Sequence, residues 1–210
     1  MRVRITFSKT EAMRFTANMD LFRAWERTMR RAGLPLEYSR GFNPRPHMQL
    51  ACALPLGFTS QCEVLDAWLQ NGNDTLERIR GNLILASPPG ILVKNVAEVE
   101  AHSPALQNLV RSAEYVVTLL DPLLDTGSRL DTLLTSTTLP RQRRGKSYDL
   151  RPLIHSLELL SPDENGHLQL QMHLAAGESR TGRPDEVLAA LGIPPQSARI
   201  HRTRLFFDQD

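Results

Sequence analysis

The sequence predicts an α+β fold made of two tandem ferredoxin-like (βαββαβ) domains, and three observations favour this class. Stretches that alternate apolar and polar residues, as strands do, are interleaved with stretches whose apolar residues recur every three or four positions, as in helices. The order of these stretches, β-α-β-β-α-β, occurs twice. The length of 210 residues holds two domains of about 100 residues each. We therefore expect a first domain at 1–100, a linker at 101–112 and a second domain at 113–210.

Each element of the first domain has its own signal. Residues 2–7 alternate as a strand. A helix follows at about 18–33, and we expect Asn18 or Thr16 to cap it and Gly33 to end it. The apolar face of this helix is formed by Leu21, Phe22, Trp25, Met29 and Ala32. The remaining elements are strands at 48–54 and 62–69, a helix at 73–85 behind a cap at Asp74, and a strand at 91–99.

The second domain repeats this order. Asn165-Gly166 is a strong turn signal between two alternating stretches and predicts a hairpin. Pro184 stands at the start of a helix that Gly192 closes. In chain order, the predicted elements are a strand at 115–120, a helix at 127–135, strands at 155–160 and 167–174, the helix that begins near 184, and a strand at 198–207.

Positive charge is concentrated in the first quarter of the chain. The first 50 residues hold ten Lys and Arg against four acidic residues, whereas the formal net charge of the whole chain is only +2. The first 50 residues therefore carry +6 and the remaining 160 carry −4. Such asymmetry favours a face that binds a polyanion, and RNA is the commonest such partner in the cell.

A basic loop at residues 38–47 is the strongest functional signal. Pro44 and Pro46 restrict the backbone and hold Arg45 extended. Arginine suits bidentate contacts to phosphate, and aromatic rings offer faces on which a base can stack. The alternative is a plain connection in which Phe42 is buried. The loop reads Tyr38-Ser39-Arg40-Gly41-Phe42-Asn43-Pro44-Arg45-Pro46-His47.

Two further basic segments add to this signal. The polar side of the first predicted helix carries Arg23, Arg27, Arg30 and Arg31. Residues 141–151 include Arg141, Arg143, Arg144 and Lys146, which are four basic residues in six positions. Both segments have the same alternative interpretation, a charged surface that is only solvated. Their occurrence together with the basic loop favours binding of a polyanion.

Several longer motifs point to a known family. They are Asn18-Met19-Asp20-Leu21-Phe22-Arg23, Arg30-Arg31-Ala32-Gly33-Leu34-Pro35, Tyr38-Ser39-x-Gly41-Phe42-Asn43-Pro44, Leu54-Pro55-Leu56-Gly57 with Glu63 downstream, Lys146 with Asp149-Leu150-Arg151-Pro152, and Arg202-Thr203. With these motifs the chain resembles the bacterial "radical SAM-linked protein" family, a domain of unknown function found beside, or fused to, cobalamin-binding radical SAM proteins. The resemblance covers most of the chain and implies a companion enzyme.

The sequence excludes several classes of activity for the chain itself. A radical SAM enzyme needs Cys-x3-Cys-x2-Cys, and the chain holds only Cys52 and Cys62. It has no Walker loop, no Gly-x-Gly-x-x-Gly and no Gly-x-Ser-x-Gly. The six histidines show no convincing ligand spacing, so we expect no metal and no cofactor. Because no apolar run approaches about 20 residues and no signal-peptide core is evident, we expect no membrane association and a cytoplasmic location.

Two alternatives to RNA binding stay open. Tandem ferredoxin-like domains with a basic cleft also resemble CRISPR-repeat-processing endoribonucleases, which cleave RNA without a metal. In that interpretation Tyr38 or His47 acts as the base toward a 2′-hydroxyl, and Arg45 stabilises the phosphorane. The other alternative is a protein–protein adaptor, whose arginines dock an acidic surface of the radical SAM partner while an exposed Trp25 or Phe42 anchors it.

The interpretation that we favour is a non-catalytic RNA-binding accessory protein that presents RNA, either tRNA or rRNA, to a radical SAM enzyme. Its expected nucleic-acid-binding residues are Arg23, Arg27, Tyr38, Arg40, Gly41, Phe42, Asn43, Arg45, His47, Arg143, Arg144 and Lys146.

Overall fold

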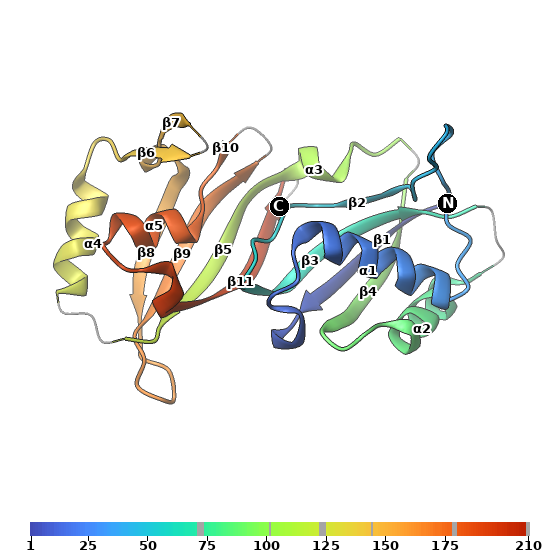
Figure 1. Ribbon diagram of the computed structural model, residues 1–210, viewed down its shortest axis with the longest axis horizontal. Helices are drawn as coiled ribbons and strands as arrows, with labels where there is room; N and C mark the ends of the chain where they lie inside the picture. The colour runs from blue at the N-terminus through green and yellow to red at the C-terminus, as the bar shows by residue number, and fades with distance from the viewer. Residues whose placement is uncertain (71–73, 101, 122–124, 144, 178–179, 209–210) are drawn as a thin grey trace. The chain divides into compact units, whose positions relative to one another are not determined.

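Helices and strands alternate through both halves of the chain and form a mixed α+β fold (Figure 1). The computed structural model describes residues 1–70, 74–100, 102–121, 125–143, 145–177 and 180–208. The chain divides into two compact units, Met1–Val110 and Arg111–Asp210. The mixed class is as predicted, whereas the ferredoxin-like assignment of each unit stays a prediction.

The first unit is built on an antiparallel sheet with the strand order β2-β3-β1-β4. Its strands and its two longer helices occur in the predicted order. A short helix, α3, falls within the stretch predicted as a linker. The elements are β1 (Arg2–Lys9), a 3-10 turn at Glu11–Met13, α1 (Asn18–Arg31), β2 (Met48–Leu50), β3 (Phe58–Trp68), α2 (Leu76–Ala86), β4 (Ile91–Val99) and α3 (Leu106–Leu109).

One face of this sheet is apolar and packs against both helices. Val3, Ile5 and Phe7 alternate along β1 and are fully buried. They belong to one core cluster with residues of α1 and α2, among them Leu21, Trp25, Met29, Ile79 and Leu83. Because successive side chains of a strand point to opposite faces, Arg2 and Arg4 lie on the other side of β1.

The C-terminal end of α1 follows the predicted signal, whereas its N-terminal end does not. Gly33 ends α1 with φ +68°, as predicted. Its N–H donates to Arg30 C=O (3.1 Å), and Leu34 N–H donates to Met29 C=O (3.1 Å), which is the Schellman pattern. The cap prediction for α1 is wrong, because the N-cap is Ala17, with no side-chain hydrogen bond, and Asn18 is already helical.

The N-cap of α2 lies one residue after the predicted Asp74. Thr75 is the N-cap, and its Oγ1 accepts from Arg78 N–H (3.3 Å). Asp74 lies too early to reach that backbone position, and its carboxylate instead pairs with the Arg78 guanidinium (3.1 Å). β2 is shorter than predicted, since it ends at Leu50 and the chain bends at Ala51 and Cys52.

The second unit has a sheet in the order β8-β9-β5-β11, in which β9 pairs antiparallel with both β8 and β5, and the short β10 pairs with the end of β9. A two-stranded hairpin, β6–β7, is inserted after the first helix. The elements are β5 (Val110–Leu119), α4 (Thr126–Thr135), β6 (Pro140–Arg143), β7 (Lys146–Asp149), a 3-10 turn at Arg151–Leu153, β8 (Ile154–Leu160), β9 (Gln169–Gly177), β10 (Arg180–Thr181), α5 (Pro184–Ala190), a 3-10 turn at Pro195–Ser197 and β11 (Ala198–Phe207).

Candidate nucleic-acid interface

Both ends of the basic loop (residues 38–47) are fastened to the end of β3. Glu37 N–H donates to Trp68 C=O (2.8 Å), Trp68 N–H donates to His47 C=O (3.0 Å), and His47 N–H donates to Glu37 C=O (2.7 Å). These backbone hydrogen bonds hold Glu37, which precedes the loop, and His47, its last residue, at one point of the sheet. The loop therefore projects from a fixed base.

The lower part of the loop is closed by its own contacts. Ser39 N–H donates to Arg45 C=O (2.8 Å), and Arg45 N–H donates to Ser39 Oγ (3.0 Å). Tyr38 and Pro46 pair as an isolated bridge. A short tip at residues 40–44 is left beyond these pairs, and all five of its residues are exposed.

Phe42 stands at this tip with its whole ring in water. Its relative exposure is 104%, and that of Tyr38 is 42%. The interpretation in which Phe42 is buried is therefore wrong. Keeping such a ring in water forgoes roughly 1.5–3 kcal/mol of burial free energy. Gly41 precedes it with φ +150°, and nothing lies within 4 Å of a Cβ built there, so a ligand has room to approach the backbone.

His47 is engaged at the base of the loop and not at its tip. Its ring lies flat on Trp68, with ring centroids 3.8 Å apart and planes inclined by 5°. The Arg2 guanidinium carbon lies 4.8 Å from the centroid of the Trp68 ring. Glu37 Oε2 is 3.9 Å from His47 Nδ1. These contacts make the side chain of His47 part of the fastening of the loop.

The arginines predicted on the first helix do lie on the exposed side of α1. Arg23 and Arg27 are exposed, and Arg23 pairs with Asp20 (3.2 Å). Arg31, in contrast, donates to the carbonyl of Ala86 (2.7 Å) and so ties α1 to the end of α2. The basic loop thus carries Tyr38 and the predicted residues from Arg40 to His47, whereas Arg23 and Arg27 lie on α1.

Trp25 is not available as an anchor for a partner. It is fully buried and packs edge-on against Phe7, with ring centroids 4.7 Å apart. The suggestion that an exposed Trp25 anchors a partner is therefore wrong. The physical reason is the helical period, which places Trp25 on the same apolar face as Leu21 and Met29.

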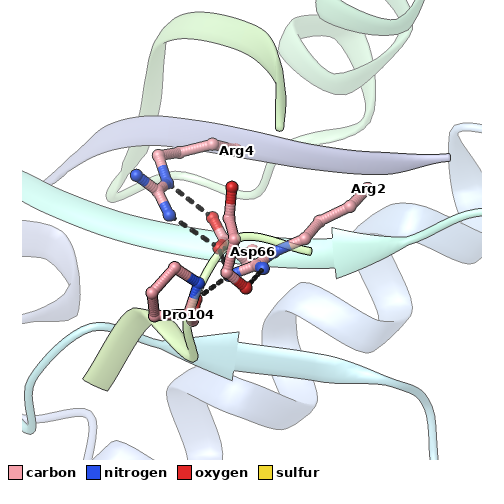
Figure 2. A network of polar contacts seen from close by, with 5 residues as sticks. Arg2, Arg4, Asp66 and Pro104 are labelled. Carbon is pink, nitrogen blue, oxygen red and sulfur yellow. Dashed lines mark hydrogen bonds and ion pairs between the residues drawn. The ribbon is translucent and has the colours of Figure 1, made fainter. Parts of the chain in front are cut away.

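A buried ion-pair network next to the base of the loop was not predicted (Figure 2). Asp66 is fully buried and accepts hydrogen bonds from Arg2 Nη2 (2.6 Å) and Arg4 Nε (2.8 Å). Arg2 also donates to the carbonyls of Ser103 (2.7 Å) and Pro104 (2.9 Å). One carboxylate therefore pairs with two guanidinium groups, and the Arg2 guanidinium also ties the chain near residue 103 to the sheet. The alternating Arg2 and Arg4 of β1 were the signal in the sequence for this network. The register of β1 against β3, which the sequence does not show, places Arg4 opposite Asp66.

The second basic segment forms the β6–β7 hairpin. Arg143 pairs directly with Lys146, and Arg141 pairs with Tyr148. Like charges directly opposite each other in a ladder are destabilising, so the hairpin tip carries an unfavourable concentration of positive charge. Burial, followed by the negative charge of Glu186, raises the pKa of Tyr148. Arg144 lies outside the described residues.

Among the described residues, no three His, Cys, Asp or Glu side chains are grouped as a metal site would require. Within the same residues, no helix is both long and apolar enough to cross a membrane.

Comparison with known proteins identifies a family. A family model described as "Uncharacterized protein conserved in bacteria (DUF2344)" matches residues 2–184. No curated protein matches the chain.

Three solved structures show low similarity. A chain of a Cbf5-Nop10-Gar1 complex is 12% identical, with a TM-score of 0.48, and the match covers 98% of this chain and 50% of that chain. The present chain thus spans half the length of that protein. An unknown protein from Galdieria sulphuraria is 14% identical, with a TM-score of 0.28 and coverages of 98% and 97%. A putative glycine cleavage system transcriptional repressor is 12% identical, with a TM-score of 0.26 and coverages of 98% and 96%.

Proposed function

The chain belongs to the DUF2344 family conserved in bacteria, and we propose that it is a non-catalytic RNA-binding accessory protein. The observation that carries the proposal is the exposed Phe42, which stands between Arg40 and Arg45 on a loop with a fixed base. A base of single-stranded RNA stacks on an aromatic ring while arginines hold the adjacent phosphates. A fixed base reduces the conformational entropy that the loop loses on binding.

The proposed partner enzyme is a cobalamin-binding radical SAM protein, to which this chain presents tRNA or rRNA. The support for this partner is the resemblance of the sequence motifs to the radical SAM-linked family. We also propose that both units are ferredoxin-like. The first unit has the element order β-α-β-β-α-β, and the second has the same order with the β6–β7 hairpin and the short β10 inserted; the sheets run β2-β3-β1-β4 and β8-β9-β5-β11.

The test of RNA binding is the double variant Arg40→Ala with Arg45→Ala. RNA affinity should fall at least about tenfold, because each lost phosphate contact removes a charge-assisted hydrogen bond. The magnitude of the slope of log K against log salt should also fall by about 0.7 for each phosphate contact to a single strand, which is about 1.4 for both arginines. Crosslinking RNA to the protein in its native cells, followed by sequencing, names the RNA. The control is Arg78→Ala, which removes an exposed arginine of α2.

Thermal unfolding of the double variant should match that of the wild type, since Arg40 and Arg45 are both exposed. Unchanged RNA affinity in this folded variant would remove the basic loop from the site.

A protein adaptor is the second candidate function, and the full exposure of Phe42 is the observation that favours it. An exposed aromatic residue beside arginines is also the composition of a protein–protein hot spot. Salt dependence does not separate the two functions, because an acidic protein surface is screened in the same way as RNA. Competition does separate them. If the radical SAM partner binds equally well with and without excess RNA, and Phe42→Ala abolishes that binding, the adaptor function is correct.

A further inference from the structure

A row of rings crosses one face of the sheet in the second unit. On β9, Leu170, Met172 and Leu174 are buried, so His173 points to the opposite face. The ring centroid of His173 lies 4.9 Å from that of His155 on β8 and 4.8 Å from that of Phe206 on β11. These three rings, from three strands, are called the ring row here.

A β-bulge and a hydrogen bond position the ring row. The register of β8 against β9 shifts between Ile154 and Ser156, so His155 is the extra residue of a bulge. Bulges re-aim side chains and are over-represented beside functional sites. His173 Nε2 also shares a hydrogen bond of 2.7 Å with Ser112 Oγ on β5. The imidazole of His173 is therefore held in one orientation.

The ring row is open to water and ends in a cation. His155 is exposed, whereas His173 and Phe206 are half-buried. The guanidinium carbon of Arg204 lies 4.5 Å from the centroid of the Phe206 ring, and Arg204 is exposed. Glu114 pairs with His173 in the register of β5 and β9 and contributes the nearby carboxylate on this face.

Neutral imidazoles are suited to stacking at neutral pH. Partial burial of the ring, and then the nearby His173, lower the pKa of His155. The lowered pKa favours the neutral ring at pH 7, which presents a flat π-face. The three rings lie on the face of the sheet opposite the buried Leu170, Met172 and Leu174.

We propose that the ring row of His155, His173 and Phe206, together with Arg204, is a second RNA contact that stacks unpaired bases and binds the adjoining phosphate. The proposal rests on the proposed RNA-binding function and adds to it a single-stranded segment bound by the second unit. Its chemistry is that of four-stranded sheets that stack two or three bases on side chains of their open face. An aromatic platform binds any base without sequence preference, because every base has a π-face.

The experiment uses the full chain and a fluorescein-labelled single-stranded RNA of about 10 nucleotides, which is within the range of site sizes for such surfaces. Affinity is measured for the wild type, for Arg204→Ala and for Phe206→Ala. The matched control is Arg199→Ala, which removes an exposed arginine from the same strand. Because Phe206→Ala could disturb the sheet, the wild-type complex is also crosslinked with ultraviolet light, and the crosslinked peptides are identified by mass spectrometry.

We expect Arg204→Ala and Phe206→Ala each to weaken binding at least about fivefold, as the loss of one stacked base or one phosphate contact does. Arg199→Ala should change binding less than twofold, and crosslinks should fall on peptides that contain His173 or Phe206. If the Arg40/Arg45 double variant loses affinity while Arg204→Ala does not, and no crosslink maps to β9 or β11, this inference is overturned and the proposed function stands. If the wild type binds no RNA, both are overturned.

Discussion

At the scale of the residue, loss of the Asp66 side chain should destabilise the fold strongly. It is fully buried, as is nearly all of the Arg2 side chain that it pairs with. In Asp66→Ala, the Arg2 guanidinium keeps its carbonyl partners but loses its counter-charge. Breaking a buried ion pair in this way costs about 3–5 kcal/mol. We therefore expect urea unfolding of Asp66→Ala to show a loss of that size.

The control for this prediction is Asp74→Ala, which removes a carboxylate from the surface pair with Arg78. An exposed pair contributes about 0–1 kcal/mol, so the free energy of unfolding should hardly change. A loss of less than about 1 kcal/mol in Asp66→Ala would show that the Arg2–Asp66–Arg4 network does not stabilise the unit.

A second prediction at the scale of the residue concerns His155 and how the stability of the protein depends on pH. Its pKa is lowered in the folded protein, first by burial and then by His173, so the folded state binds fewer protons than the unfolded state. The stability that this provides is fully present above the ordinary histidine pKa of about 6.5 and is lost as the pH falls toward the folded-state value. Between pH 7.5 and 5.5, the Tm of the wild type should drop up to about 2 °C further than that of His155→Gln, because solvent screens a largely exposed ring. Parallel Tm curves would contradict this prediction.

At the scale of the element, the basic loop has a fixed base and an exposed tip. His47 stacks on Trp68 at the base, so we infer that it positions the loop and that the tip contacts RNA. His47→Ala should then weaken RNA binding about threefold, through lost pre-organisation, whereas His47→Phe should bind like the wild type, since phenylalanine keeps the stacked ring. Affinities of both variants for the same RNA check this.

The same pair of variants tests the endoribonuclease alternative. A general base must accept a proton, and phenylalanine cannot. If RNA is cleaved by the wild type and both variants lose cleavage, His47 is a catalytic residue and its positioning role is insufficient.

At the scale of the whole molecule, each of the two units has one sheet face packed against helices and one face that carries polar or charged side chains. In the first unit, that second face holds the Arg2–Asp66–Arg4 network. In the second unit, it holds the ring row. The charge asymmetry between the first 50 residues and the rest of the chain therefore describes only part of the surface available to a polyanion. The basic loop contributes exposed charge, and the second unit contributes stacking rings.

Local signals in the sequence predicted the order of the longer helices and strands and the apolar face of α1, because periodicity and terminal glycines are local properties. They did not predict α3, the β6–β7 hairpin or β10. Strand β4 has the predicted bounds, Ile91–Val99, and Gly33 ends α1. The composition and position of the basic loop were likewise local. The two predicted N-caps were each wrong by one residue: α1 begins behind Ala17, which has no side-chain hydrogen bond, and in α2 Thr75 rather than Asp74 accepts from Arg78 N–H.

Which distant side chains meet depends on the tertiary structure. Asp66 reaches Arg2 and Arg4 across 64 and 62 positions of sequence, and His173 meets Ser112 across 61. Strand register sets such pairs, and a shift of one residue would turn every side chain to the other face. The stack of His47 on Trp68, which fastens the basic loop, arises in the same way. Composition named the residues of the candidate site, and sheet register decided which of them hold the site in place.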